Sequence, residues 1–146
     1  MTLRLLDPAG HGVELTVLGY EFPAAASTAE AYDPDANWLV VHAVARTGDG
    51  VREVTEPCLT TSEARGLADW LRAVADGRGW ASLTFTEPTL AFRLSRQAGG
   101  SAALEVRLRA THSPGVPTTV GLVVPSPDLR AAADAWAHHL LDHPER

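Results

Sequence analysis

Residues 35–44 read Asp-Ala-Asn-Trp-Leu-Val-Val-His-Ala-Val, and no other run in the chain reads as a strand buried on both faces. Side chains alternate between the two faces of a strand, so the row from Trp38 to Val44 faces one way and the row from Leu39 to Ala43 faces the other. Both rows are largely apolar, whereas a strand wet on one side alternates apolar with polar residues. The stretch therefore predicts a covered strand at the centre of a sheet.

The composition predicts one globular domain, residues 1–146, with 45% hydrophobic and 21% charged residues. No apolar run approaches the roughly 20 residues that span a membrane. The first ten residues also lack the basic start and apolar core of a signal peptide. Cys58 is the only cysteine in the sequence. A lone cysteine excludes an internal disulfide and favours a cytoplasmic location.

The net charge of the chain is unevenly placed. Residues 1–60 contain nine acidic and three basic residues, whereas residues 61–146 contain nine of each, so the whole net charge of −6 lies in the first part. An acidic surface argues against nucleic acid as a direct partner, because phosphates are bound by positive surfaces. It favours a basic protein partner, although a merely solubilising surface has the same composition.

Hydrophobic periodicity predicts an α+β fold in the order ββββ-α-ββββ-α. We expect an antiparallel, strongly twisted sheet of about seven to eight strands with two packed helices. The first helix is predicted at 60–77, where Thr60 and Glu63 form a capping box and Trp70 adjoins the apolar stripe. The second helix is predicted to start at Ser126 as its N-cap. The strands are predicted at 3–6, 12–22, 35–44, 51–56, 81–86, 90–95, 102–110 and 118–124.

Two polar residues, His42 and Glu87, interrupt otherwise apolar strands. If they converged in a pocket, they could serve a small hydrolase-like enzyme as acid and base. Alternatively, His42 is a core histidine whose ring nitrogens are hydrogen-bonded, and Glu87 has a purely structural role. Cys58 has no histidine near it in sequence to act as its base, so we interpret it as a small buried hydrophobic residue.

The sequence predicts neither a metal nor a cofactor. His139 and His143 lie four residues apart on the last helix, but no glutamate or cysteine ligand accompanies them. Residues 33–37 have acidic residues at alternate positions, as at the start of a calcium-binding loop. However, Trp38 occupies the position where that loop needs glycine, and Val44 the position where it needs glutamate. We therefore expect a turn that hydrogen-bonds its own backbone. There is no phosphate loop, dinucleotide fingerprint or Gly-x-Ser-x-Gly motif.

Three segments together resemble one known family. They are Asp-Ala-Asn-Trp-Leu-Val-Val at 35–41, Ser-Glu-Ala-Arg-Gly-Leu-Ala-Asp-Trp-Leu at 62–71 and Leu-Thr-Phe-Thr-Glu-Pro-Thr-Leu at 83–90. In this order they are similar to the WapI-type immunity proteins of bacterial polymorphic-toxin systems. The similarity spans roughly residues 13–143, and the closing residues 142–146 look similar too. The chain departs from the pattern at Thr89, where asparagine is expected after Glu-Pro.

The resemblance implies a non-enzymatic protein that binds and neutralises the nuclease tip of a secreted toxin in the cytoplasm of the producing cell. Such a tip is commonly basic, and an acidic surface would steer it in quickly. We expect the contacts to be led by four acids of the first 60 residues: Glu30, Asp33, Asp35 and Glu53. A self-associating scaffold, including a homodimer with a buried sheet face, is the alternative alongside the enzyme. We expect no membrane partner.

Overall fold

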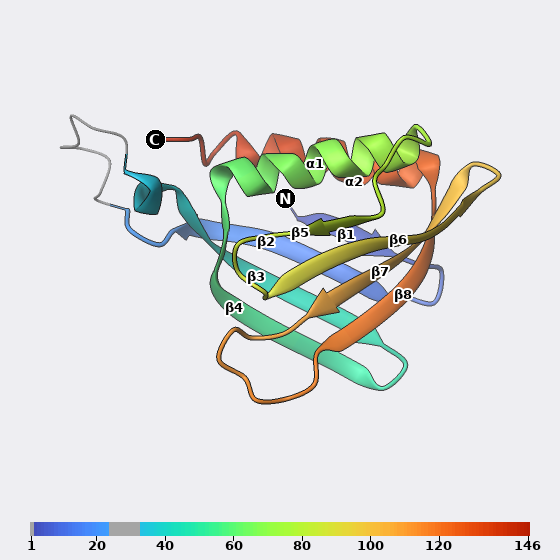
Figure 1. The fold of residues 1–146 in the computed structure, drawn as a ribbon, viewed down its shortest axis with the longest axis horizontal. Helices are drawn as coiled ribbons and strands as arrows, with labels where there is room; N and C mark the ends of the chain where they lie inside the picture. The colour runs from blue at the N-terminus through green and yellow to red at the C-terminus, as the bar shows by residue number, and fades with distance from the viewer. Residues whose placement is uncertain (1, 24–32) are drawn as a thin grey trace.

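The computed structural model describes residues 2–23 and 33–146. Figure 1 shows the strands and helices in the expected order, so the α+β class and the order ββββ-α-ββββ-α are confirmed. The first half contains β1 (Leu3–Leu6), β2 (Gly12–Tyr20), β3 (Trp38–Thr47), β4 (Gly50–Thr60) and α1 (Thr61–Ala75). The second half contains β5 (Ser82–Thr84), β6 (Leu90–Ala98), β7 (Ser101–Leu108), β8 (Thr118–Pro125) and α2 (Ser126–Leu140). A short 3-10 helix, η2 (Pro34–Asn37), leads into β3.

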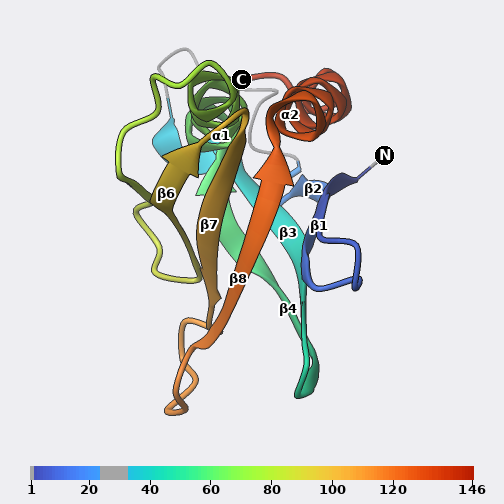
Figure 2. The same ribbon diagram turned by 90° about the vertical axis from the view of Figure 1, so that its right-hand side faces the viewer.

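The strands form two antiparallel sheets of four, in the orders β1-β2-β3-β4 and β5-β6-β7-β8. Figure 2 shows α1 and α2 side by side at one end, with the two sheets splayed apart beneath them. Buried residues from both sheets and both helices belong to one hydrophobic cluster. Each sheet therefore buries one face in a shared core that the two helices close at one end.

Strand β3 pairs with β2 on one side and β4 on the other, so it is an interior strand of its sheet. Its inward row is fully buried: Leu39, Val41 and Ala43. The prediction that both faces are covered is wrong for part of the outward row, which is half-buried: Trp38, Val40 and His42. The reason is that both helices pack on the inner side, and no described element lies over this part of the outer face.

The start of α1 follows the predicted capping box. The Thr60 hydroxyl accepts the Glu63 N–H at 3.1 Å, and the Glu63 carboxylate accepts the Thr60 N–H at 3.1 Å. The other Glu63 oxygen accepts the Thr86 N–H at 2.6 Å. Glu63 therefore begins the helix and also fixes the loop between β5 and β6 beside it.

The predicted N-cap of α2 is wrong by one residue. Ser126 is the first residue of the helix, and Pro125 holds the cap position without a side-chain hydrogen bond. The β7–β8 ladder continues to the pair Ser101 and Pro125, and the Ser126 N–H donates to the Gly100 carbonyl at 2.8 Å. The strand thus runs directly into the helix and leaves no room for a separate capping residue.

Two tryptophans anchor the helices in the core. Trp70 and Trp136 are fully buried, which confirms the prediction for Trp70. Each indole N–H has a carbonyl partner, as a buried indole requires. Trp70 donates to Trp80 at 2.9 Å, and Trp136 donates to Ala64 at 2.8 Å. The second bond joins α2 directly to α1.

Candidate partner-binding site

An open hollow of about 510 Å³ lies where the end of β2, η2 and the start of β3 meet β4, the loop between β5 and β6 and the segment after β7. It is lined by Glu21, Phe22, Asp35, Trp38, Glu56, Pro57, Glu87, Thr111 and His112. Four of these residues are acids and none is an arginine, so we call this site the acidic hollow. Phe22, which is 47% exposed, and the half-buried Trp38 add aromatic surface beside the carboxylates.

Glu56 is the fixed carboxylate of the acidic hollow. Its Oε1 accepts the Thr111 N–H at 2.9 Å, the Thr111 hydroxyl at 2.7 Å and the Thr89 hydroxyl. Burial raises the pKa of Glu56, but the hydrogen bonds from Thr89 and Thr111 outweigh it, so the pKa lies below its ordinary value. Because Glu56 is on β4 and its partners flank β6 and β7, this charged group ties the two sheets together.

Replacing Glu56 with alanine is expected to lower the free energy of unfolding by about 1.5–3 kcal/mol at pH 7. A folded-state pKa below the unfolded value stabilises the protein above the unfolded pKa of about 4.3, and this contribution is lost as the pH falls through the folded value. Urea unfolding at pH 7 and at pH 3 measures the difference in free energy of unfolding between the parent chain and Glu56→Ala. This difference should be smaller at pH 3. Glu53→Ala, an exposed acid on the same strand, is the control. An equal loss of stability at both pH values would contradict the claim that the ionised carboxylate of Glu56 stabilises the fold.

The structure separates the four acids predicted from the sequence. Asp33 caps η2, because its carboxylate accepts the Asp35 N–H at 3.0 Å, so the predicted backbone-bonding turn is confirmed. Asp35 lines the acidic hollow. Glu53 lies elsewhere, on the outer face of the first sheet, where it contacts His42 at 3.2 Å. Glu30 lies outside the described residues.

The other acids of the hollow are Glu21, Glu56 and Glu87, which sequence reasoning did not assign to a shared surface. A signal was available for two of them. Thr-Glu-Pro occurs at 55–57 and again at 86–88, and each copy supplies one glutamate of the hollow. Glu87 reaches this site because the Glu63–Thr86 and Glu56–Thr89 hydrogen bonds hold its loop beside β4.

The enzyme hypothesis required His42 and Glu87 to converge, and the structure does not bring them into one hollow. Glu87 lines the acidic hollow, whereas His42 contacts Glu53 on the outer face of β3 and β4. The predicted burial of Cys58 is confirmed, at 1% exposure. Burial, together with the nearby carboxylates, raises the pKa of Cys58 to about 12, so the thiol is protonated at neutral pH and is a poor nucleophile.

His139 has a structural role in joining α2 to β2. Its Nε2 accepts the Val17 N–H at 2.9 Å, which requires the neutral imidazole. Burial lowers the pKa of His139, and the neighbouring His143 lowers it further. The ring also packs against Trp136, at 5.9 Å between centroids. Across residues 2–23 and 33–146, no group of three His, Cys, Asp or Glu side chains is arranged to hold a metal ion.

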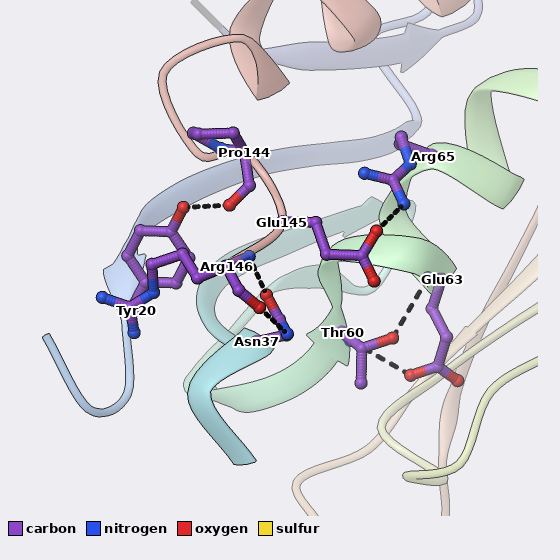
Figure 3. A network of polar contacts seen from close by, with 8 residues as sticks. All are labelled: Tyr20, Asn37, Thr60, Glu63, Arg65, Pro144, Glu145 and Arg146. Carbon is purple, nitrogen blue, oxygen red and sulfur yellow. Dashed lines mark hydrogen bonds and ion pairs between the residues drawn. The ribbon is translucent and has the colours of Figure 1, made fainter. Parts of the chain in front are cut away.

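The closing residues 144–146 hold the segments that shape the acidic hollow (Figure 3). Asn37 is only 2% exposed; its Oδ1 accepts the Arg146 N–H at 2.8 Å and its Nδ2 donates to the Arg146 carbonyl at 3.0 Å. The Tyr20 hydroxyl donates to the Pro144 carbonyl, and Arg65 pairs with Glu145 at 2.8 Å. Through the closing residues, these contacts join the end of β2, η2 and α1.

The Arg146 guanidinium completes this clamp. It lies over the Tyr20 ring, 3.7 Å from its centroid, and donates to the carbonyls of Phe22 and Ala36, both at 2.7 Å. Phe22 lines the acidic hollow, and so does Asp35, which precedes Ala36 in the sequence. The clamp therefore places these two lining residues.

Asn37→Ala is expected to lower the free energy of unfolding by about 1–3 kcal/mol, because the backbone N–H and carbonyl of Arg146 both lose their partner. Thermal or urea unfolding of the full chain measures this loss. Asp35→Ala, an exposed neighbour on the same short helix, is the control and should change stability by less than about 0.5 kcal/mol. An Asn37→Ala protein as stable as the parent would show that the clamp contributes nothing.

The fold and the hollow define an α+β protein with two four-stranded meanders, two helices and a surface hollow rich in carboxylates. The chain belongs to the WapI-like immunity protein family, whose family model matches residues 4–144. This match confirms the resemblance drawn from the sequence. A search among curated proteins found no match. No helix in the described part of the chain is long and apolar enough to cross a membrane.

The segments that carry the resemblance meet in pairs in the structure. Residues 35–41 meet the closing residues through Asn37 and Arg146. Residues 62–71 meet 83–90 through Glu63 and Thr86. These pairs hold η2 and the loop between β5 and β6, which supply Asp35 and Glu87 to the acidic hollow, while Glu21 and Glu56 lie outside the four segments.

Proposed function

We propose that this chain is an immunity protein that binds and neutralises a cognate toxin nuclease domain in the cytoplasm of the producing cell, without catalysing a reaction. Membership of the WapI-like immunity protein family supports a toxin partner in general. The observation that carries the proposal is the acidic hollow, where four carboxylates gather with two aromatic side chains. A nuclease must present positive charge to its phosphate substrate, so this surface is complementary to it.

Binding alone is sufficient for neutralisation if the chain covers the basic surface that the nuclease uses for nucleic acid. Complementary charge speeds the encounter, and the aromatic surface of Phe22 and Trp38 provides the apolar contact that holds the complex. We retain four contact residues proposed from charge: Glu30, Asp33, Asp35 and Glu53. To these we add the three other acids of the hollow: Glu21, Glu56 and Glu87.

Co-expression with the toxin domain encoded beside this gene tests the proposal. The full chain should restore growth of cells that produce the toxin domain and should co-purify with it. The double variant Glu21→Lys/Asp35→Lys should lose protection, whereas Asp49→Lys/Asp128→Lys, which carries the same charge change away from the hollow, should keep it. If the parent chain neither binds nor neutralises that domain, the proposal fails.

A further inference from the structure

We propose that the acidic hollow receives an arginine side chain of the toxin domain, with the guanidinium between the carboxylates and against the aromatic surface of Trp38 and Phe22. This inference rests on the proposed function and names the chemistry of the contact. The hollow, at about 510 Å³, is open to solvent and large enough to admit a guanidinium group.

The carboxylates of the hollow lack a cationic partner among the described residues. Among residues 2–23 and 33–146, none of its four acids forms an ion pair, whereas acids elsewhere do: Glu14, Asp76, Glu105, Asp134 and Glu145 each contact an arginine. Residues 24–32 contain neither arginine nor histidine. His112 is the one basic residue in the lining. The hollow therefore keeps an unneutralised negative charge that a cation from a partner can satisfy.

Glu56 presents one carboxylate oxygen in a fixed position. All three of its hydrogen bonds go to Oε1, and Oε2 has no partner within the described residues. A carboxylate whose orientation is already set loses little conformational freedom when a guanidinium binds. The site is therefore preorganised for a charged donor.

Arginine fits this combination better than lysine. A guanidinium is flat, so it can stack on an aromatic ring while its fork of N–H groups donates to oxygen atoms. The same two segments already hold an arginine in this way. Arg146 stacks on Tyr20 (Figure 3) and donates to the carbonyls of Phe22 and Ala36. The acidic hollow offers a second such arrangement, with Trp38 as an aromatic surface and carboxylates as acceptors.

An NMR titration of the full chain tests the inference, with three probes: N-acetyl-arginine amide, its lysine counterpart and its uncharged citrulline counterpart. The arginine probe should give saturable shifts at the Trp38 indole N–H and the Phe22 amide. The lysine probe should bind about threefold or more weakly, because its ammonium does not stack. The citrulline probe, which has the same shape without the charge, should give no saturable shift.

Matched variants locate the binding. Glu21→Gln/Asp35→Asn should weaken arginine binding about fivefold or more, whereas Asp49→Asn/Asp128→Asn, the same charge change at two exposed acids outside the hollow, should leave it unchanged. Trp38→Leu should remove the preference for arginine over lysine. Equal shifts with arginine and citrulline, or undiminished arginine binding in the Glu21/Asp35 variant, would overturn the inference.

The outcomes also separate this inference from the proposed function. If the parent chain and Trp38→Leu neutralise the toxin domain equally and the arginine probe does not bind, the inference is wrong and the immunity function stands. If the arginine probe binds but the chain does not bind the toxin domain, the proposed function is wrong, and the arginine occupant proposed here is wrong with it.

Discussion

Replacing Asp35 and Glu87 with lysine together should slow association with the toxin domain by about tenfold or more at low salt. The two residues come from opposite halves of the chain and line the same hollow, so the double change reverses the local field that attracts a basic partner. The salt dependence of the association rate should also flatten, because less long-range attraction remains to be screened. Asp33 is left intact because its carboxylate caps η2 and its loss would mix a structural effect with the charge effect.

Stopped-flow association over a series of salt concentrations measures this effect. The control is Asp49→Lys/Asp128→Lys, which changes the net charge equally but lies outside the acidic hollow. The association rate of the control should stay near that of the parent chain. Equal slowing in both double variants would assign the effect to net charge alone, and unchanged kinetics would exclude Asp35 and Glu87 from the contact.

Replacing His139 with alanine should lower the free energy of unfolding by about 3–5 kcal/mol. The buried ring packs on Trp136, and its Nε2 is the acceptor of the Val17 N–H, so the variant leaves both a cavity and an unpaired backbone donor. His138→Ala, an exposed histidine one residue away, is the matched control and should cost less than about 1 kcal/mol.

The same histidine makes stability depend on pH. Because the folded state lowers the pKa of His139, the unfolded state binds the proton first, and stability falls as the pH drops below the unfolded value of about 6.5. Urea unfolding between pH 8 and pH 5 should show this decline in the parent chain and a smaller one in His139→Ala. A decline of the same size in both proteins would show that another group is responsible.

Sequence periodicity was sufficient for the elements of this fold because their signals are local. The capping box of Thr60 and Glu63 and the buried stripe around Trp70 lie within a few residues of one another. The division of the strands into two sheets is different, because it depends on which strands pair across α1. The sequences of β4 and β5 contain no signal that the two strands belong to separate sheets.

The acidic hollow was harder to predict than the elements that carry it. The sequence placed the net charge in the first 60 residues, but one acid of the hollow, Glu87, comes from the second half. Glu53 and Glu56 are three residues apart on one strand, and side chains at that spacing face opposite sides. Only the tertiary contacts of Thr89 and Thr111 show that Glu56 turns toward the hollow.

The apolar outward row of β3 also has a different meaning in the structure. Trp38 and Val40 are half-buried, and Trp38 lines the acidic hollow, although their apolarity predicted a covered face. Sequence alone does not distinguish an apolar residue that faces the core from one that faces a partner. Trp38, the first residue of this half-covered row, therefore belongs to the aromatic surface that we propose for toxin binding.

Amide hydrogen exchange of the full chain, free and bound to the toxin domain, tests the central claim most directly. We expect protection on binding to concentrate in the segments that line the acidic hollow, at 20–23, 33–38 and 86–89, with little change on the exposed faces of α1 and α2. Protection confined to the helices or to the outer face of the second sheet, with none around the hollow, would contradict the claim that this hollow binds the toxin.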